Sequence, residues 1–432
     1  MTRDHKPAPN VHLASLGCAK NLVDSERLLA TLASAGALVG AGPDEADVII
    51  VNTCGFIAPA VEESIRTIAE YAALGTSGKP KTLIVMGCLP ERFGDELRAR
   101  LPDVDLIVGL HAHDAIVKAC GLSAGGPDEA RLLLTPAHTA YLRISDGCDN
   151  RCSYCTIPLI RGGLTSRSPG DILREAEDLM RGGVRELVVI GQDTTSYGTD
   201  LATPYPVHRL LHDLSEIEEL AWIRLLYTHP AHFSNELIAE YAGNRKLCAY
   251  VDLPLQHLAD DILRRMGRRV TQEDCISLIG RLRAQVPDVA VRTTFIIGFP
   301  GETDADFELL LDGVRALRFD HLGAFAYCAE PDTPAARYPD QVPSRVVEAR
   351  LDELMAVQQE IVFENNEAAL GRTVEVLLDE PAEEDGVWVG RTQHQAPDVD
   401  SVTFVLGDGL STGRIVTAEL VGTEDYDLIA EA

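Results

Sequence analysis

Short apolar runs alternate with amphipathic stretches over the first part of the chain. The runs, each of which predicts a β-strand, are Val11–Leu16, Val48–Val51, Thr82–Met86 and Leu106–Val108. Between them, Ser25–Ala35 and Glu62–Leu74 carry apolar residues at helical spacing, and a glycine follows each stretch. This alternation predicts a parallel sheet covered by helices. We expect the domain to occupy residues 1–125 and to end within the glycine-rich segment Gly121–Asp128.

A second alternating series begins at Tyr141. Its predicted strands are Tyr141–Ile144, Leu187–Ile190, Trp222–Tyr227, Ala249–Leu253, Val291–Ile296 and Leu322–Phe325. Helical patterns such as Asp171–Arg181 and Asp304–Leu317 lie between the strands, and a long amphipathic stretch, Ser344–Leu370, follows the last one. Six such units predict a partial (β/α)6 barrel over residues 134–365. Its active site would lie at the carboxyl ends of the strands.

The last part of the chain has a different pattern. Its β-prone runs, separated by turns that contain Gly and Asp, are Thr373–Leu378, Val387–Val389, Val402–Val405 and Ile415–Leu420. Short strands with such turns predict a small closed β-barrel over residues 366–432. The predicted fold class is therefore α/β: an N-terminal parallel-sheet domain, a central partial barrel and a C-terminal small β-barrel.

Composition and charge narrow the class of protein. The chain is 46% hydrophobic and 24% charged, which is typical of a globular protein. It has no apolar run near the ~20 residues of a membrane helix and no apolar secretory leader, so we expect a cytoplasmic protein with no membrane partner. The net charge of −29 repels phosphate backbones and attracts basic partners. Simple solubility explains that acidity equally well until the charge is localised.

Three closely spaced cysteines follow the first strand of the predicted barrel. Cys148, Cys152 and Cys155 stand in the segment ISDGCDNRCSYC, at C-x3-C-x2-C spacing. Thiolates are soft ligands that suit iron–sulfur clusters. Three of them hold three corners of a 4Fe-4S cluster and leave one iron open to an exchangeable ligand. A structural zinc site would need a fourth ligand nearby, and the next histidine along the chain is His208.

This loop, placed after the first strand of a partial barrel, is similar to that of the radical S-adenosylmethionine superfamily. The resemblance implies that the open iron binds S-adenosyl-L-methionine, whose cleavage gives a 5′-deoxyadenosyl radical. Tyr154 matches the aromatic position that packs near the cluster and adenine. Further cofactor contacts expected at the strand ends are Gln192, Asp193, Gln256, Arg268 and Gly298. A glycine permits close backbone approach and an arginine pairs with a carboxylate, although each signal alone is weak.

A second set of cysteines is widely spaced in the sequence. Cys18, Cys54 and Cys88 each come one to three residues after a predicted strand. Because the carboxyl ends of parallel strands share one edge of a sheet, the three thiols are able to converge there. The alternative is that each is a small buried apolar residue. We expect that structural role for the cysteines that match no motif, which are Cys120, Cys248, Cys275 and Cys328.

The sequence motifs around this second set closely resemble the N-terminal domain of the methylthiotransferases. They are SLGCAKNLVDSE, VNTCGFI and MGCLPER. The resemblance extends over nearly the whole chain. It implies that Cys18, Cys54 and Cys88 ligate a second 4Fe-4S cluster, which takes part in sulfur insertion. Two cofactor types are thus expected: two 4Fe-4S clusters and S-adenosyl-L-methionine.

The methylthiotransferase family divides by substrate. One branch modifies adenosines of transfer RNA, the other modifies an aspartate of small-subunit ribosomal protein twelve, and both carry a C-terminal TRAM barrel that helps to bind the substrate. From Leu370 to Ala432 the chain has three arginines, no lysine and fourteen acidic residues, a net charge of −11. A barrel this acidic is expected to bind RNA poorly and a basic ribosomal protein well. The segment Gly390–Ser401 also resembles the ribosomal-protein branch, with departures at Gln395 and Ser401.

The resemblance implies a reaction in which a radical removes hydrogen from the aspartate β-carbon and a methylthio group takes its place. That C–H bond has no useful acidity, so a cofactor must carry the hard step. An external one-electron donor such as a flavodoxin or ferredoxin is required. Two alternatives remain: a transfer-RNA adenosine methylthiotransferase, which the acidic barrel opposes, and a non-catalytic iron–sulfur scaffold that binds ribosomal components, which the open triplet opposes.

Overall fold

The computed structural model describes residues 8–77, 81–123 and 130–432. The chain divides into two compact units, which we describe separately. The first comprises Met1–Leu134, Asp146–Asp149 and Thr156–Leu164, and the second comprises Thr135–Ser145, Asn150–Cys155 and Thr165–Ala432. The loop with the cysteine triplet therefore contributes residues to both units. Most of the predicted linker Gly121–Asp128 lies outside the described residues.

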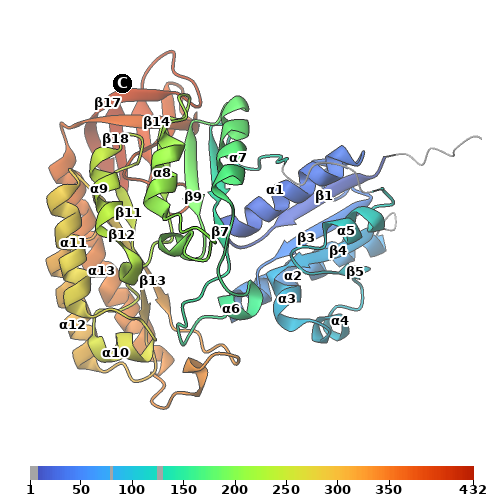
Figure 1. The fold of residues 1–432 in the computed structure, drawn as a ribbon, viewed down its shortest axis with the longest axis horizontal. Helices are drawn as coiled ribbons and strands as arrows, with labels where there is room; N and C mark the ends of the chain where they lie inside the picture. Colours follow the sequence, from blue (N-terminus) through green and yellow to red (C-terminus); the bar gives the residue numbers. More distant parts are fainter. Residues whose placement is uncertain (1–7, 78–80, 124–129) are drawn as a thin grey trace, which may run out of the picture. The chain divides into compact units, whose positions relative to one another are not determined.

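The first unit is a parallel five-stranded sheet in the order β2-β1-β3-β4-β5, of which Figure 1 labels β1, β3, β4 and β5. Its strands are β1 (Asn10–Ser15), β2 (Leu38–Val39), β3 (Val48–Thr53), β4 (Thr82–Gly87) and β5 (Leu106–Ile107). Its helices are α1 (Ala19–Ser34), α2 (Ala58–Ser77), α3 (Cys88–Phe93), α4 (Glu96–Arg100), α5 (His113–Ala119) and the short α6 (Ile157–Ile160). The predicted parallel sheet is confirmed, with β2 as an additional strand.

Alternation along the buried strands gives this sheet two apolar cores. Ile50 packs with residues of α1 and α5 on one face, whereas Ile49 and Val51 pack with residues of α2, α3 and α4 on the other. Successive side chains of a strand point to opposite faces, so a continuous apolar run such as that of β3 is suited to a sheet covered on both sides. Because both faces of the sheet are covered, polar side chains gather in the loops at its carboxyl edge.

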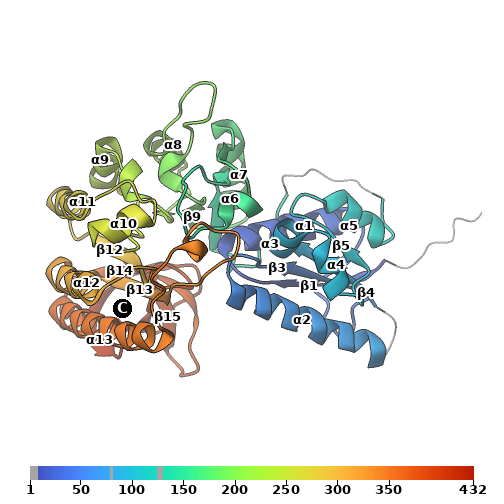
Figure 2. The same ribbon diagram turned by 90° about the horizontal axis from the view of Figure 1, so that it is seen from below.

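The second unit begins with an open barrel of two parallel sheets, ordered β10-β9-β6 and β11-β12-β13. The strands are β6 (Thr139–Arg143), β9 (Glu186–Ile190), β10 (Trp222–Leu225), β11 (Tyr250–Asp252), β12 (Ala290–Ile297) and β13 (His321–Ala326). Figure 2 shows an arc of helices outside them: α7 (Pro169–Arg181), α8 (Val207–Ser215), α9 (Asn235–Gly243), α11 (Gln272–Gln285), α12 (Asp304–Leu317) and α13 (Ser344–Ala369). The predicted partial (β/α)6 barrel is confirmed.

Short elements complete the loops around this barrel. They are β7 (Ser145–Asp146), β8 (Thr165–Ser166), α10 (Asp260–Arg265) and the 3₁₀ turns Thr194–Ser196, Pro230–His232 and Ala335–Arg337. Helix α12 begins with a capping box in which Thr303 accepts from the Asp306 amide and Asp306 accepts from the Thr303 amide. This reciprocal cap satisfies amides that the first turn leaves open, and it fixes the helix start directly after the loop at Gly298.

The C-terminal part of the second unit is a closed barrel in the order β14-β15-β16-β18-β17. Its strands are β14 (Thr373–Pro381), β15 (Val387–Thr392), β16 (Thr403–Leu406), β17 (Ile415–Glu424) and β18 (Asp427–Glu431). Inward residues of all these strands except β15 form its apolar core, against which Trp388 of β15 packs. The predicted barrel is confirmed. The strand β18 was not predicted, because its sequence DLIAE is short and bounded by acidic residues.

Buried ion pairs join this closed barrel to the amino ends of the central strands. Arg391 donates to Glu186 Oε2 at 2.7 Å and also bonds to Asp379, while Arg224 Nε donates to Glu186 Oε1 at 2.9 Å. Asp400 accepts from Tyr250 Oη at 2.7 Å. The segment Gly390–Ser401 thus holds the two parts of the second unit together. Among the described helices, none is long and apolar enough to span a membrane.

Candidate functional site

The first unit brings three cysteines together at the carboxyl edge of its sheet. Cys18 is the N-cap residue of α1, three residues after the end of β1, Cys54 directly follows β3, and Cys88 begins α3 directly after β4. Burial raises the pKa of the Cys88 thiol to about 12; the nearby Arg161 lowers it, whereas Cys18 and Cys54 raise it. Burial likewise raises the pKa of Cys54. The wide sequence spacing of these residues is therefore compatible with one shared site.

Glycines make room for this convergence. A Cβ on Gly17, whose φ is +89°, would lie 2.8 Å from Cys54 Cβ and 3.1 Å from its sulfur. A Cβ on Gly55 would lie 2.8 Å from the Cys88 carbonyl oxygen. Any larger residue would push the cysteine loops apart. Three soft sulfur donors in a space kept open by glycines fit an iron–sulfur cluster.

Arg161 adds a buried cation to the same site, and sequence reasoning missed it. Its guanidinium donates to Asp24 Oδ2 at 2.9 Å, to Asn21 Oδ1 at 2.8 Å and to Asp146 Oδ1 at 3.1 Å, and it lies 3.8 Å from Cys88 Sγ. A positive charge beside a thiol stabilises the thiolate that a metal requires. The sequence offered only a weak signal for it, an arginine six residues after Cys155 that directly follows the apolar turn IPLI.

The loop of the cysteine triplet is held by backbone bonds within each unit. In the first unit, Cys148 N donates to Gly162 O at 3.1 Å. In the second unit, Ser153 N donates to Met266 O at 2.9 Å, and a Cβ on Gly267 would lie 2.8 Å from the Arg151 oxygen. All three cysteines of the triplet are partly exposed. Thiols that are neither buried nor disulfide-bonded suit a site that receives a metal cluster.

Tyr154 and Arg268 lie beside Cys152 in the second unit. Burial raises the pKa of Tyr154 well above its usual value, and the Arg268 guanidinium partly opposes this shift. Arg268 Nη2 donates to Pro254 O at 2.5 Å. Two buried donors at this rim, Arg268 Nε and Gln192 Nε2, have no hydrogen-bond partner among the described residues. Orphaned buried donors are costly, so they fit a ligand that brings an anionic or carbonyl oxygen.

Gln256 and Gly298 have backbone roles at the carboxyl ends of the strands. Gln256 has a φ of +72°. Its backbone N–H donates to Thr294 O, and its backbone carbonyl accepts from Ile296 N. Gly298 has a φ of +76°, and its amide donates to Glu302 Oε2 at 2.8 Å. A Cβ there would lie 2.3 Å from Val347, so packing against α13 also requires this glycine. Their contacts with a cofactor stay a prediction.

Asp193 is the centre of a dense hydrogen-bond network. Its carboxylate accepts from Asn150 Nδ2 at 2.7 Å, from His232 Nδ1 at 2.8 Å, and from the side chains of Thr195 and Ser196. Burial favours the neutral acid, but these bonds outweigh it and hold the pKa of Asp193 well below its usual range. Because Asn150 stands between Cys148 and Cys152, Asp193 anchors the loop of the cysteine triplet.

His229 and His232 also belong to this network, and sequence reasoning missed both. Their rings stack at 4.8 Å, and with Asp193 they offer three metal-binding atoms within 4.8 Å of one another. However, His229 Nδ1 accepts from the Ala231 amide at 3.2 Å, so its neutral ring carries the proton on Nε2. Burial lowers its pKa to about 3. The group is therefore a hydrogen-bond network; the signal for it was the pair of histidines in THPAH after β10.

The cysteines outside the two sets are buried with one exception. Cys120, Cys248 and Cys275 are buried, as predicted. The prediction was wrong for Cys328, which is partly exposed and donates to Glu330 Oε1 at 3.1 Å. It follows β13 at the open side of the barrel, where fewer side chains cover the strand.

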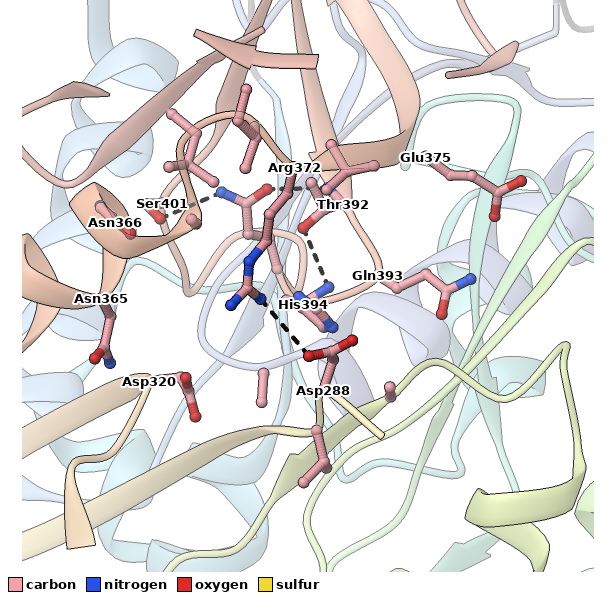
Figure 3. Close-up of a pocket in the computed structure, with 18 of the residues that line it drawn as sticks. Asp288, Asp320, Asn365, Asn366, Arg372, Glu375, Thr392, Gln393, His394 and Ser401 are labelled. Atoms are coloured by element: carbon pink, nitrogen blue, oxygen red, sulfur yellow. Dashed lines mark hydrogen bonds and ion pairs between the residues drawn. The ribbon is translucent and has the colours of Figure 1, made fainter. Parts of the chain in front are cut away.

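A separate cavity of about 500 Å³ lies between the closed barrel and the amino ends of β12 and β13 (Figure 3). Its lining is part polar and part apolar, and Figure 3 shows Arg372 directed toward Asp288, with which it forms an ion pair at 3.6 Å. Chemistry in β/α barrels takes place at the carboxyl ends of the strands. This cavity is at the opposite end, so we do not assign the reaction to it.

Family models match the chain in three segments. Residues 10–109 match "Uncharacterized protein family UPF0004", residues 142–313 match "Radical SAM superfamily" and residues 370–432 match "TRAM domain". The cysteine triplet lies in the second segment, and Cys18, Cys54 and Cys88 lie in the first.

Similar proteins match over almost the whole chain. "Ribosomal protein uS12 methylthiotransferase RimO" of Syntrophus aciditrophicus is 45% identical over 98% of both chains. The proteins of the same name from Clostridioides difficile and Desulforamulus reducens are 43% and 42% identical, each over 98% of this chain and over 98% and 99% of their own.

Solved structures share the fold at low sequence identity. The radical S-adenosylmethionine methyltransferase TsrM from Kitasatospora setae, with cobalamin and a 4Fe-4S cluster bound, has a TM-score of 0.55 and 16% identity, over 76% of this chain and 77% of that one. The cobalamin-dependent radical enzyme OxsB with S-adenosylmethionine bound has a TM-score of 0.52 and 14% identity, over 82% of this chain and 56% of that one. These likenesses show the fold alone.

Proposed function

Because the chain belongs to the ribosomal protein uS12 methylthiotransferase family, we propose that it adds a methylthio group to the β-carbon of an aspartate in ribosomal protein uS12. The observation that carries this proposal is 42–45% identity to relatives of that name over 98% of this chain. The proposed domains are a methylthiotransferase N-terminal domain (1–125), a radical SAM domain (134–365) and a TRAM domain (366–432). The reaction is proposed to take place in the cytoplasm.

The cofactors of the proposed enzyme are two 4Fe-4S clusters and S-adenosyl-L-methionine. Cys148, Cys152 and Cys155 would hold one cluster and leave one iron open. Cys18, Cys54 and Cys88 would hold the other cluster at the sheet edge. When bound, these groups would supply a radical that abstracts a hydrogen atom from carbon, and a methylated sulfur for transfer. An external donor, of the flavodoxin or ferredoxin class, supplies the electron.

The protein side chains bind and position. Gln192 Nε2 and Arg268 Nε are buried donors suited to the carboxylate of S-adenosylmethionine. The Asp193 network fixes Asn150, and with it the loop between Cys148 and Cys152. A fixed loop matters because reacting groups must be held in a narrow range of distances.

Surface charge supports a protein substrate in preference to transfer RNA. In the fully described residues 370–432, the exposed acidic residues are Glu375, Glu380, Glu383, Glu384, Asp385, Asp398, Asp408, Glu419, Glu424, Asp425 and Glu431. The exposed cations of the same residues are Arg372 and Arg414, since Arg391 is buried in ion pairs. Phosphate capture requires clustered cations, whereas a ribosomal protein is itself basic because it binds RNA.

Two cysteine variants test the division of labour between the proposed clusters. We expect Cys152→Ala to abolish cleavage of S-adenosylmethionine to 5′-deoxyadenosine in the reduced, reconstituted protein, with the protein still folded. We expect Cys54→Ala to retain that cleavage and to lose transfer of the methylthio group to uS12. Cys275→Ala, at a buried cysteine outside both sets, is the matched control for losing a thiol. Full turnover by Cys152→Ala would contradict the proposal.

A further inference from the structure

The last strand of the central barrel, β13, has an open edge. Among the described strands it pairs with β12 alone. Tyr327 N, just beyond β13, donates to Ile297 O of β12 at 2.8 Å. Because backbone groups alternate in direction along a strand, those of Leu322, Ala324 and Ala326 point away from β12. Such an edge is a template on which another extended segment can add as a strand.

An acidic pocket of about 180 Å³ lies at the amino end of this edge. Its lining includes Asp320, Asp400 and Asp427, together with Leu322 of β13 and residues of α13. Arg292 is shared between Asp400 at 3.2 Å and Asp252 at 3.6 Å, and the ring of His321, which also lines the pocket, lies 3.4 Å from Asp400, so the three aspartates still outnumber these two groups. The pocket as a whole therefore keeps a negative charge that favours a cation. It shares Asp320 with the larger cavity, where Figure 3 shows this residue.

Gln358 of α13 gives this pocket an unsatisfied acceptor. The residue is 2% exposed, and its Nε2 donates to Phe319 O at 2.8 Å. That bond orients the amide so that Oε1 is the acceptor, and Oε1 has no hydrogen-bond partner among the described residues. Leaving a buried acceptor unpaired costs roughly 1–3 kcal/mol. A bound donor, such as an ammonium or guanidinium group, would remove that cost.

Exposed apolar side chains stand along the same edge. Phe325 of β13 is 59% exposed, Val399 is 51% exposed and Tyr426 is 38% exposed. Val399 and Tyr426 both line the acidic pocket. Each is flanked on both sides by aspartate in the sequence. Exposed apolar side chains beside aspartates suit a partner peptide segment that carries both basic and apolar residues.

We propose that the open edge of β13 and the acidic pocket together, here called the β13 groove, bind an extended segment of the basic protein substrate. The segment adds as a strand to β13 and places a lysine or arginine side chain beside Asp320, Gln358 and Asp427. This inference rests on the proposed function, which supplies a ribosomal protein as the partner. A strand of six residues spans roughly 20 Å, from the pocket to the carboxyl end of the barrel. The modified aspartate is thus expected about five to seven residues from the anchored cation.

The strand addition is tested by the affinity of reconstituted full-length protein for purified uS12, measured by isothermal titration calorimetry. Ala326→Pro removes an amide that points to the open edge, so the ladder to β12 keeps its bonds. We expect at least about fivefold weaker binding, the loss of one hydrogen bond or more. Ala326→Ser, which retains the amide at the same exposed position, is the control. Iron content and circular dichroism establish that each variant is folded.

The charge of the pocket is tested independently by the double variant Asp320→Asn/Asp427→Asn. Both asparagines keep the oxygen that accepts from Val291 N or Val402 N, so the local structure is preserved. We expect about tenfold weaker binding of uS12 at low salt, and a smaller difference at high salt. Glu218→Gln/Glu219→Gln makes the same charge change at exposed positions between α8 and β10, outside both the groove and the closed barrel, and its affinity should match that of wild type.

Two results would overturn the inference in different ways. If Ala326→Pro and the asparagine pair bind uS12 as tightly as wild type and the controls, the groove is not the docking surface, and the proposed function still stands. If wild type does not bind uS12 and methylthiolates transfer RNA instead, the proposed function fails and this inference fails with it.

Discussion

At the scale of single residues, the chemistry depends on sulfur atoms and on the groups that surround them. The position of each cysteine was predictable, because a residue that follows a parallel strand lies at a known edge of the sheet. Arg161, His229 and His232 were not predictable, since their partners are set by how loops fold around that edge. The contact of Asp193 with a cofactor stays a prediction, whereas its hydrogen bond to Asn150 gives it a role in holding the loop of the cysteine triplet.

Arg161 gives a test at this scale. Arg161→Gln removes a cation that lies 3.8 Å from Cys88 Sγ, while the amide can still donate to neighbouring carboxylates. We expect a more negative reduction potential for the cluster assigned to Cys18, Cys54 and Cys88, because the added electron loses a favourable charge. The measurement is a potentiometric titration followed by electron paramagnetic resonance. Arg414→Gln, at an exposed position, is the control; equal potentials in both variants would contradict the role of Arg161.

At the scale of elements, strand and helix periods predicted most of the architecture. The strands that the sequence did not predict are short. Strand β2 has two residues, and β18 has five residues with an acidic residue at each end. The segment Gly390–Ser401 was interpreted from resemblance alone. The structure gives it a physical role, because Arg391 and Asp400 bond to side chains of the central strands. Such long-range pairs have no local signal in the sequence.

The buried pairs around Glu186 give a prediction for stability. Arg391 and Arg224 outweigh the effect of burial and lower the pKa of Glu186, so its stabilising charge is fully present at neutral pH. That contribution is lost as the pH falls through the depressed folded-state value. We expect Glu186→Gln to lower the free energy of unfolding by about 3–5 kcal/mol at neutral pH, and by less in acid. Urea unfolding measures this, with exposed Glu380→Gln as control; an equal deficit at every pH would contradict it.

At the scale of the whole molecule, the distribution of charge bears on the choice between a protein substrate and transfer RNA. The sequence gives a net charge of −29 and places −11 of it in the last domain, but it does not say which of those charges are exposed. Exposed carboxylates dominate the closed barrel, while Arg391 is withdrawn into ion pairs. Folding thus leaves the closed barrel with fewer exposed cations than its composition suggests. A basic protein is the partner that this surface favours.

The most direct test of the proposed function offers both substrates to one enzyme. Protein reconstituted anaerobically is incubated with reductant, S-adenosylmethionine, uS12 and transfer RNA, and each product is analysed by mass spectrometry. We predict that uS12 gains one methylthio group in place of one hydrogen, localised by fragmentation to the β-carbon of an aspartate, and that transfer RNA is unchanged. A methylthio group on an adenosine, with uS12 unmodified, would contradict the account.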